Sequence, residues 1–139
     1  MTRLLLDTHI LVWFAHGDER VGPHARAAIN RAAAAGALHL SAISAWEVAM
    51  LVAKGRLALA QDVEQWLDEA LARLNLRLEA LSVGIAVASS RLPGMVHGDP
   101  ADRILAATAR ALGAALVTVD EKLLDYARAG HLLALDGSI

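Results

Sequence analysis

The sequence predicts an α/β fold in which a central parallel sheet of four to five strands carries helices on both faces. Short apolar runs alternate with longer segments of helical periodicity, and this alternation is typical of parallel strands joined by crossover helices. The chain has 139 residues, of which 56% are hydrophobic, so it has the size and apolar content of one domain with a buried core. We therefore expect a single domain over residues 1–139.

Five short runs are interpreted as strands. The run AALVTVD is the strongest of them, RLLLD indicates a buried strand, and LRLEALS alternates apolar and polar residues as a half-buried strand does. The five segments are 3–7, 37–43, 76–82, 114–120 and 132–136, and the last is expected at an edge of the sheet.

Helices are predicted between these strands. The segment 22–36 has proline near its start and glycine at its end, which is the expected order for a helix. The segment 61–75 is amphipathic. Its apolar face comprises Val63, Trp66, Leu67, Ala70, Leu71 and Leu74. The remaining helices are expected after the first strand and at 44–54, 83–91, 100–112 and 121–129.

Composition excludes several classes of protein. The chain has no cysteine, so it forms neither disulfides nor thiolate metal sites. A net charge of −2 argues against a strong electrostatic binder of nucleic acid. No apolar run approaches the roughly 18 residues of a membrane span, and the first one ends at Asp7, too short for a signal peptide. We expect a cytoplasmic protein without a membrane association.

Five acidic residues are placed where a site can form. In an open parallel sheet, ligands bind beyond the carboxyl ends of the strands. Asp7 and Asp120 each follow a predicted strand, and Glu47 lies one turn into the helix after the second strand. Asp99 and Asp102 lie at the start of another helix. The five carboxylates are therefore expected to converge on one edge of the sheet.

Helix capping is the alternative explanation for these acids. Asp7, Asp99 and Asp120 each precede a predicted helix, which is the preferred place of an aspartate N-cap. Ser44 and Glu47 match the spacing of a capping box. Capping accounts for each residue singly, but it does not explain why an acid rather than serine, threonine or asparagine takes the position at all three aspartates.

A divalent cation accounts for the acids as a group. Neighbouring carboxylates repel one another and raise one another's pKa values, and a cation removes that penalty. An all-oxygen donor set suits Mg²⁺ or Mn²⁺ and disfavours structural zinc. His9 and His97 lie near the expected site, either as ligands or as hydrogen-bonded structural residues. Trp13, Trp46 and Trp66 are interpreted as core or interface residues.

Three ordered motifs resemble the PIN-domain ribonucleases of the VapC toxin type. They are LLLDTHILVW, SAISAWEVAMLVAKGRLAL and HGDPADRILAATARALGAALVTVDEKLLDY, and together they span nearly the whole chain. The resemblance implies a PIN-like domain whose four catalytic and metal-binding acids are Asp7, Glu47, Asp102 and Asp120. Asp99 is then auxiliary, either as a helix cap or in support of a ligand, and Thr8, Ser44 and Thr118 orient ligands or water. Arg103 is either a phosphate contact or a solvated side chain.

The resemblance also implies an activity and partners. It implies hydrolysis of an RNA phosphodiester with one or two Mg²⁺ or Mn²⁺ ions and an activated water. It further implies a homodimer and a cognate VapB-type antitoxin lying across the active-site groove, to which the helix pair 44–54 and 61–75 contributes.

Three rival interpretations stay open at this point. LLLDT resembles the start of a HAD-type phosphatase, but that family requires D-x-D and His9 occupies the second acidic position. A non-catalytic module with a PIN fold would bind RNA or a protein. A housekeeping PIN nuclease would have the same acids without an antitoxin.

Overall fold

The computed structural model describes residues 2–94 and 98–139 and contains the predicted parallel sheet. The strands are β1 (Leu4–Leu6), β2 (Leu38–Ser41), β3 (Arg77–Glu79), β4 (Ala115–Thr118) and β5 (Ala134–Asp136). Their order across the sheet is β3-β2-β1-β4-β5, and every neighbouring pair is parallel. The predicted fold class is confirmed, including β5 as an edge strand. Each strand is shorter than the apolar run that predicted it, because flanking residues belong to turns and helix caps.

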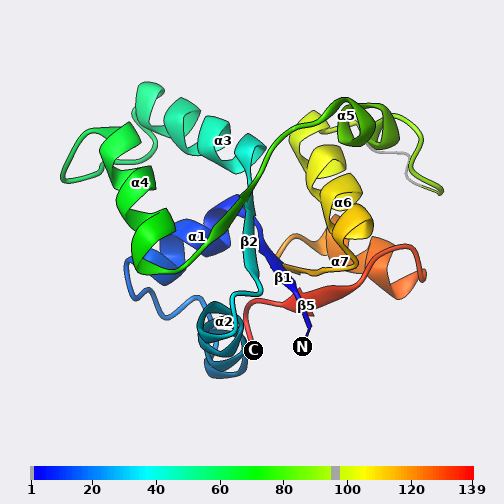
Figure 1. Ribbon diagram of the computed structural model, residues 1–139, viewed down its shortest axis with the longest axis horizontal. Coiled ribbons are helices and arrows are strands. Elements are labelled where there is room, and N and C mark those ends of the chain that lie inside the picture. Colours follow the sequence, from blue (N-terminus) through cyan, green and yellow to red (C-terminus); the bar gives the residue numbers. More distant parts are fainter. Residues whose placement is uncertain (1, 95–97) are drawn as a thin grey trace.

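Helices cover both faces of the sheet (Figure 1). They are α1 (Thr8–Ala15), α2 (Pro23–Ala34), α3 (Ala42–Ala53), α4 (Val63–Arg73), α5 (Val83–Ser89), α6 (Pro100–Leu112) and α7 (Glu121–Arg128). Figure 1 shows α1 to α4 on one side of the strands and α5 to α7 on the other. No helix in the described part of the chain is long and apolar enough to cross a membrane.

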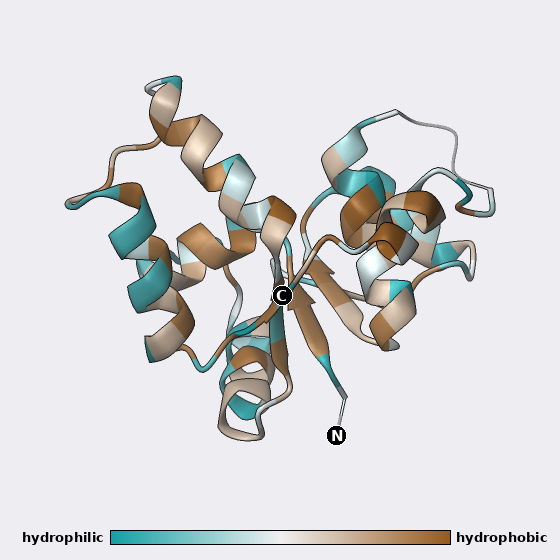
Figure 2. Ribbon diagram, turned by 45° about the horizontal axis from the view of Figure 1, so that its top comes forward, coloured by the Kyte–Doolittle hydropathy of each residue, from teal (hydrophilic) through white to brown (hydrophobic). Residues whose placement is uncertain are grey.

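The two faces of the sheet bury two separate apolar clusters. Along β1, Leu4 and Leu6 belong to the cluster under α1 to α4, whereas Leu5 belongs to the cluster under α6 and α7. This division follows from the two-residue repeat of a strand, which points successive side chains to opposite faces. The central strands are correspondingly hydrophobic along their length (Figure 2). The three residues of β1 thus contribute side chains to both apolar clusters.

Helix α3 begins two residues earlier than predicted. Ser41, the last residue of β2, is its N-cap and accepts a hydrogen bond from the Ile43 backbone N–H at 3.1 Å. Ser44 therefore lies inside the first turn and is completely buried. The capping-box interpretation of Ser44 and Glu47 is wrong, which leaves both side chains available for other contacts.

The last residues of the chain close over the start of α2. The Gly22 N–H donates to the Gly137 carbonyl at 2.9 Å, and the Ala25 N–H donates to the Ile139 carbonyl at 2.8 Å. A Cβ at Gly22 would lie 2.4 Å from the Ile139 carbonyl carbon, well inside van der Waals contact. Glycine is required at position 22 by this close approach of two backbones.

Candidate active site

The acidic residues meet at the carboxyl edge of the sheet, where the strand order reverses. The chain runs outward from β1 through β2 to β3 and then crosses to β4 and β5 on the other side of β1. Ligands of open α/β sheets bind at such a switch point. Asp7 directly follows β1, and Asp120 follows β4 by two residues. The two acids lie at the carboxyl ends of strands, as the sequence predicted, and the strand order places them at the switch point.

Asp7 is buried and held by two hydrogen bonds. Its Oδ1 accepts from the Thr8 backbone N–H at 2.7 Å, and its Oδ2 accepts from the Thr118 hydroxyl at 2.6 Å. Burial nevertheless raises the pKa of Asp7 above its ordinary value, because the two hydrogen bonds only partly offset the desolvation of the charge, and Asp120 adds repulsion. Asp7 is thus a positioned carboxylate in an environment that disfavours an uncompensated negative charge.

The carboxylate of Glu47 is held by the side chain of the first residue of α1. The Thr8 hydroxyl donates to Glu47 Oε1 at 2.5 Å and is also hydrogen-bonded to the buried Ser44 hydroxyl at 2.9 Å. Partial burial raises the pKa of Glu47, and the charges of Asp7 and Asp99 raise it further. Thr8 and Ser44, expected to orient ligands, thus hold the carboxylate of Glu47 in place.

Asp99 and Asp102 bring two more carboxylates from the start of α6. Asp99 is the N-cap and accepts a hydrogen bond from the Ala101 N–H at 3.1 Å. Asp102 lies in the first turn and is half-buried. Its pKa is raised from 3.8 to about 7, first by desolvation and then by the charges of Asp99, Asp7 and Asp120. The charges of three of the other four acids therefore raise the pKa of Asp102, which places Asp102 at the electrostatic centre of the group.

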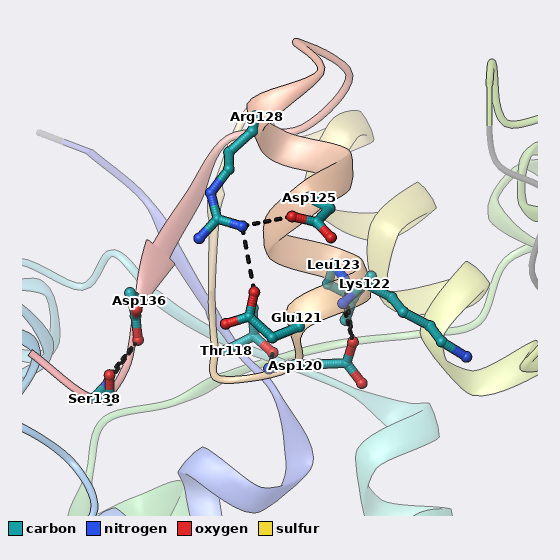
Figure 3. Close-up of polar contacts among 9 residues, drawn as sticks. All are labelled: Thr118, Asp120, Glu121, Lys122, Leu123, Asp125, Arg128, Asp136 and Ser138. Carbon is teal, nitrogen blue, oxygen red and sulfur yellow. Dashed lines mark hydrogen bonds and ion pairs between the residues drawn. The ribbon is translucent and has the colours of Figure 1, made fainter.

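Asp120 completes the group from the start of α7 (Figure 3). Its Oδ1 accepts from the backbone N–H groups of Lys122 at 2.8 Å and Leu123 at 3.2 Å. The Asp120 N–H in turn donates to the Thr118 hydroxyl oxygen at 3.0 Å. Because the same hydroxyl donates to Asp7, Thr118 links the two acids that flank the switch point.

Both interpretations of the aspartates apply at once. Asp7, Asp99 and Asp120 are N-caps, as the alternative predicted. Capping and clustering are compatible, because the carboxyl ends of parallel strands and the N-termini of the following helices meet at one edge of the sheet. The helix N-termini also carry partial positive charge, which offsets some of the repulsion among the caps.

A cavity of about 370 Å³ opens beside three of these acids, Asp99, Asp102 and Asp120. It is lined by Gly98, Asp99, Asp102, Asp120, Glu121 and Lys122. Lys122 was not singled out from the sequence, although it follows Asp120 by two residues and supplies the cation of this lining. The neighbouring Glu121 carboxylate accepts a hydrogen bond from Arg128 at 3.4 Å, and in Figure 3 its side chain points away from that of Lys122.

The donor set matches a hard divalent cation in its chemistry. All the candidate ligands are carboxylates, and Mg²⁺ or Mn²⁺ prefers such oxygens. Burial, followed by repulsion from other carboxylates, raises the pKa values of Asp7, Glu47 and Asp102, and a bound cation would offset both effects. Within residues 2–94 and 98–139, no three His, Cys, Asp or Glu side chains are yet grouped closely enough to hold an ion. The acids therefore form an electrostatic cluster and not a closed coordination shell.

The remaining candidates occupy the border of the site. Arg103 donates from Nε to the Ser89 carbonyl at 2.9 Å and so ties α6 to the end of α5. His9 packs against Trp13 with ring centroids 5.8 Å apart, and its charge lowers the pKa values of Asp7 and Glu47. His97 lies outside the described residues.

Comparisons with known proteins identify the family. The model of the PIN domain matches residues 4–129, so the chain belongs to the PIN-domain family. The chain is 37% identical over 123 residues to ribonuclease VapC22 of Mycobacterium tuberculosis, which covers 88% of this chain and 91% of that protein. The predicted resemblance to VapC-type PIN domains is confirmed.

Two solved structures share the fold. VapBC2 from Rickettsia felis, bound to a DNA fragment from their promoter, matches with a TM-score of 0.66 and 21% identity over 96% of this chain and 98% of that one. FitAcB from Neisseria gonorrhoeae matches with a TM-score of 0.61 and 21% identity over 96% of this chain and 97% of that one.

Proposed function

We propose that this protein is a Mg²⁺- or Mn²⁺-dependent endoribonuclease and the toxin of a VapBC-type toxin–antitoxin pair. The observation that carries the proposal is the convergence of Asp7, Glu47, Asp102 and Asp120 at the switch point of the sheet, with three of their pKa values raised. Helix capping alone does not account for Glu47 and Asp102, because neither residue caps a helix. The relationship to a ribonuclease supports RNA as the substrate.

The four acids have distinct roles in this proposal. Asp7 and Asp102 are the direct ligands of the ion, because burial disfavours the negative charge of both carboxylates and a bound cation would compensate it. Glu47 and Asp120 complete the shell or orient water. When bound, the ion supplies a water nucleophile at neutral pH and neutralises charge on the phosphate.

The surrounding hydroxyl groups keep the acids in position. Thr118 holds Asp7 through Oδ2, and Thr8 holds Glu47 through Oε1. Both hydrogen bonds favour the ionised carboxylate and so oppose the effect of burial. These threonines therefore favour the charged form of the acids, which is the form that binds a cation.

Cleavage of structured RNA tests the enzyme. Wild-type protein should cleave in Mg²⁺ or Mn²⁺ and not in EDTA, and folded Asp102→Asn should lose most of this activity. Asp125→Asn is the matched control, because it removes one carboxylate from α7 that pairs with Arg128 outside the site. Calorimetric titration with Mn²⁺ gives a second readout, in which Asp102→Asn should weaken binding and Asp125→Asn should not. Undiminished cleavage by folded Asp102→Asn would refute the proposed site.

We further propose an antitoxin partner and a homodimer. The named neighbours include VapBC and FitAcB assemblies, which supports a partner chain. Helices α3 and α4 pack against each other, and α3 carries Glu47 of the acidic group; this helix pair would contribute to the groove in which the antitoxin lies. Purification together with the product of the adjacent reading frame, followed by light scattering, tests both; a bare monomer in every preparation would contradict them.

A further inference from the structure

A second cavity, of about 470 Å³, adjoins the acidic site between the starts of α3 and α6. It is lined by Ala42, Ile43, Trp46, Glu47, Leu81, Asp99, Pro100 and Ala101. Two of these residues, Glu47 and Asp99, belong to the acidic group, so the cavity and the site are continuous. The rest of the lining is apolar. A ligand bound at the acids therefore has an apolar compartment directly beside it.

Trp46 is the largest side chain of this compartment, and it is 56% exposed. The other two tryptophans are covered by the rest of the protein. Trp66 is 8% exposed, and the Arg20 guanidinium lies 4.5 Å from the centre of the Trp13 ring. Trp46 has no ring or cation–π contact with any described residue. Of the two roles expected for Trp46, core or interface residue, its exposure excludes the core, and its ring is available to a ligand. Leu81, 44% exposed, lines the same cavity.

The charges of the lining define what can enter. Among the described residues of the lining, the ionisable side chains are Glu47 and Asp99, whose carboxylates would repel a phosphate. A neutral planar base would stack on an indole ring, as bases of single-stranded RNA stack on aromatic side chains. Carboxylates only accept hydrogen bonds. An aliphatic peptide side chain would desolvate them without pairing them, whereas a base with N–H donors would pair them.

Guanine meets this requirement best among the four bases. It carries adjacent N1–H and N2–H donors on one edge, which match the two oxygens of a carboxylate such as that of Asp99, the acid of this lining that is not assigned to the ion. Cytosine and adenine place a ring acceptor beside their amino group, and uracil has a single N–H between two carbonyls. The acceptor-only lining therefore discriminates in favour of guanine.

We infer that the Trp46 cavity is a nucleobase subsite of the active site, in which a guanine adjacent to the scissile phosphate stacks on Trp46. The inference rests on the proposed ribonuclease function, since it assumes an RNA phosphate at the acids. Trp46 is a specificity-determining residue in this arrangement, and the acids carry the chemistry.

Tryptophan fluorescence tests the cavity without requiring cleavage. In the presence of Mg²⁺, guanosine 5′-monophosphate should quench the tryptophan fluorescence of the wild-type protein at a lower concentration than uridine 5′-monophosphate does. Trp46→Phe should abolish that saturable quenching, because the remaining reporters, Trp13 and Trp66, lie outside the cavity. Equal responses to the two nucleotides, or the same guanosine response in Trp46→Phe, would overturn the inference. Quenching by an apolar peptide but by neither nucleotide would assign the cavity to a protein partner and also overturn it.

Cleavage of an RNA pool with randomised sequence tests the role in specificity. Wild-type cuts should cluster beside guanine. Trp46→Ala should lower kcat/KM at those sites by about 10- to 100-fold, the scale of one lost base–aromatic stack, and lose the preference. Trp46→Phe should retain both. Leu133→Ala, which truncates a side chain 61% exposed outside the cavity, is the control and should change neither. Unchanged sites and rates in Trp46→Ala would overturn the inference. If the wild type cuts no RNA, the proposed function fails while the fluorescence result still decides on the cavity.

Discussion

The repulsion within the acidic cluster should make one loss-of-function substitution stabilising. In the metal-free protein, the pKa of Asp102 is raised from 3.8 to about 7 by desolvation and by the charges of Asp99, Asp7 and Asp120. The folded state therefore binds a proton at Asp102 more tightly than the unfolded state does. By linkage, its ionisation lowers the free energy of unfolding as pH rises from about 4 to 7, and the full penalty is present above pH 7. Asp102→Asn removes this penalty.

The size of the effect follows from the shift. At 1.36 kcal/mol per pKa unit, the penalty has a ceiling of about 4 kcal/mol. Because Asp102 is only half-buried, solvent screening reduces the expected gain to about 1–2 kcal/mol at pH 8. For a domain of this size, that gain raises Tm by about 3–6 °C. At pH 5, where Asp102 is largely protonated in the folded state but ionised in the unfolded state, the gain should fall to about a third of its value at pH 8.

Thermal unfolding followed by circular dichroism at pH 5 and pH 8, both in EDTA, measures this difference. Asp125→Asn removes the same charge from an exposed position and breaks an ion pair with Arg128, so it should leave Tm unchanged or slightly lower at both pH values. Adding Mn²⁺ should raise the Tm of the wild type more than that of Asp102→Asn, because only the wild type keeps the full ligand set. An Asp102→Asn protein no more stable than wild type at pH 8, or equally stabilised at both pH values, would refute the electrostatic reasoning.

Two further substitutions test contacts that support the site and the fold. Thr118→Val deletes the 2.6 Å hydrogen bond to Asp7, so the pKa of Asp7 should rise further, and unfolding free energy should fall by about 1–3 kcal/mol in urea titrations; calorimetry should show weaker Mn²⁺ binding, and affinity equal to wild type would contradict this role. Gly22→Ala places a Cβ 2.4 Å from the Ile139 carbonyl carbon and should cost about 1–3 kcal/mol. Gly84→Ala is its control, because the nearest atom is 3.8 Å away inside helix α5, and it should be neutral or stabilising; similar losses in both variants would rule out the clash as the cause.

Local patterns were sufficient for the elements and for the place of the acids. Pro100 at the start and Gly113 after the end bounded α6 correctly, because the fixed φ of proline and the left-handed conformation of glycine, here at φ 64°, act on the backbone locally. An apolar run followed by an acid located Asp7 and Asp120 at the carboxyl edge, because all strands of a parallel sheet end on the same side. The start of α3 was misplaced because Ser41 and Ser44 are equally good caps by sequence.

Other properties arise only from the tertiary structure, because they depend on residues far apart in the chain. The Thr118 hydroxyl reaches Asp7 across 111 positions, and no local pattern contains that hydrogen bond. The pKa of Asp102 depends on burial and on charges at the starts of two other helices, α1 and α7, as well as on Asp99 at the start of its own helix. The exposure of Trp46 was likewise not predictable from the sequence, since the same spacing suits a core residue or an exposed one. The sequence by itself determined the strands, the helices and the order of the acids, because local sterics and periodicity govern these. The sheet order alone brought the acids together and left an aromatic ring uncovered beside them, because both outcomes depend on which strands become neighbours.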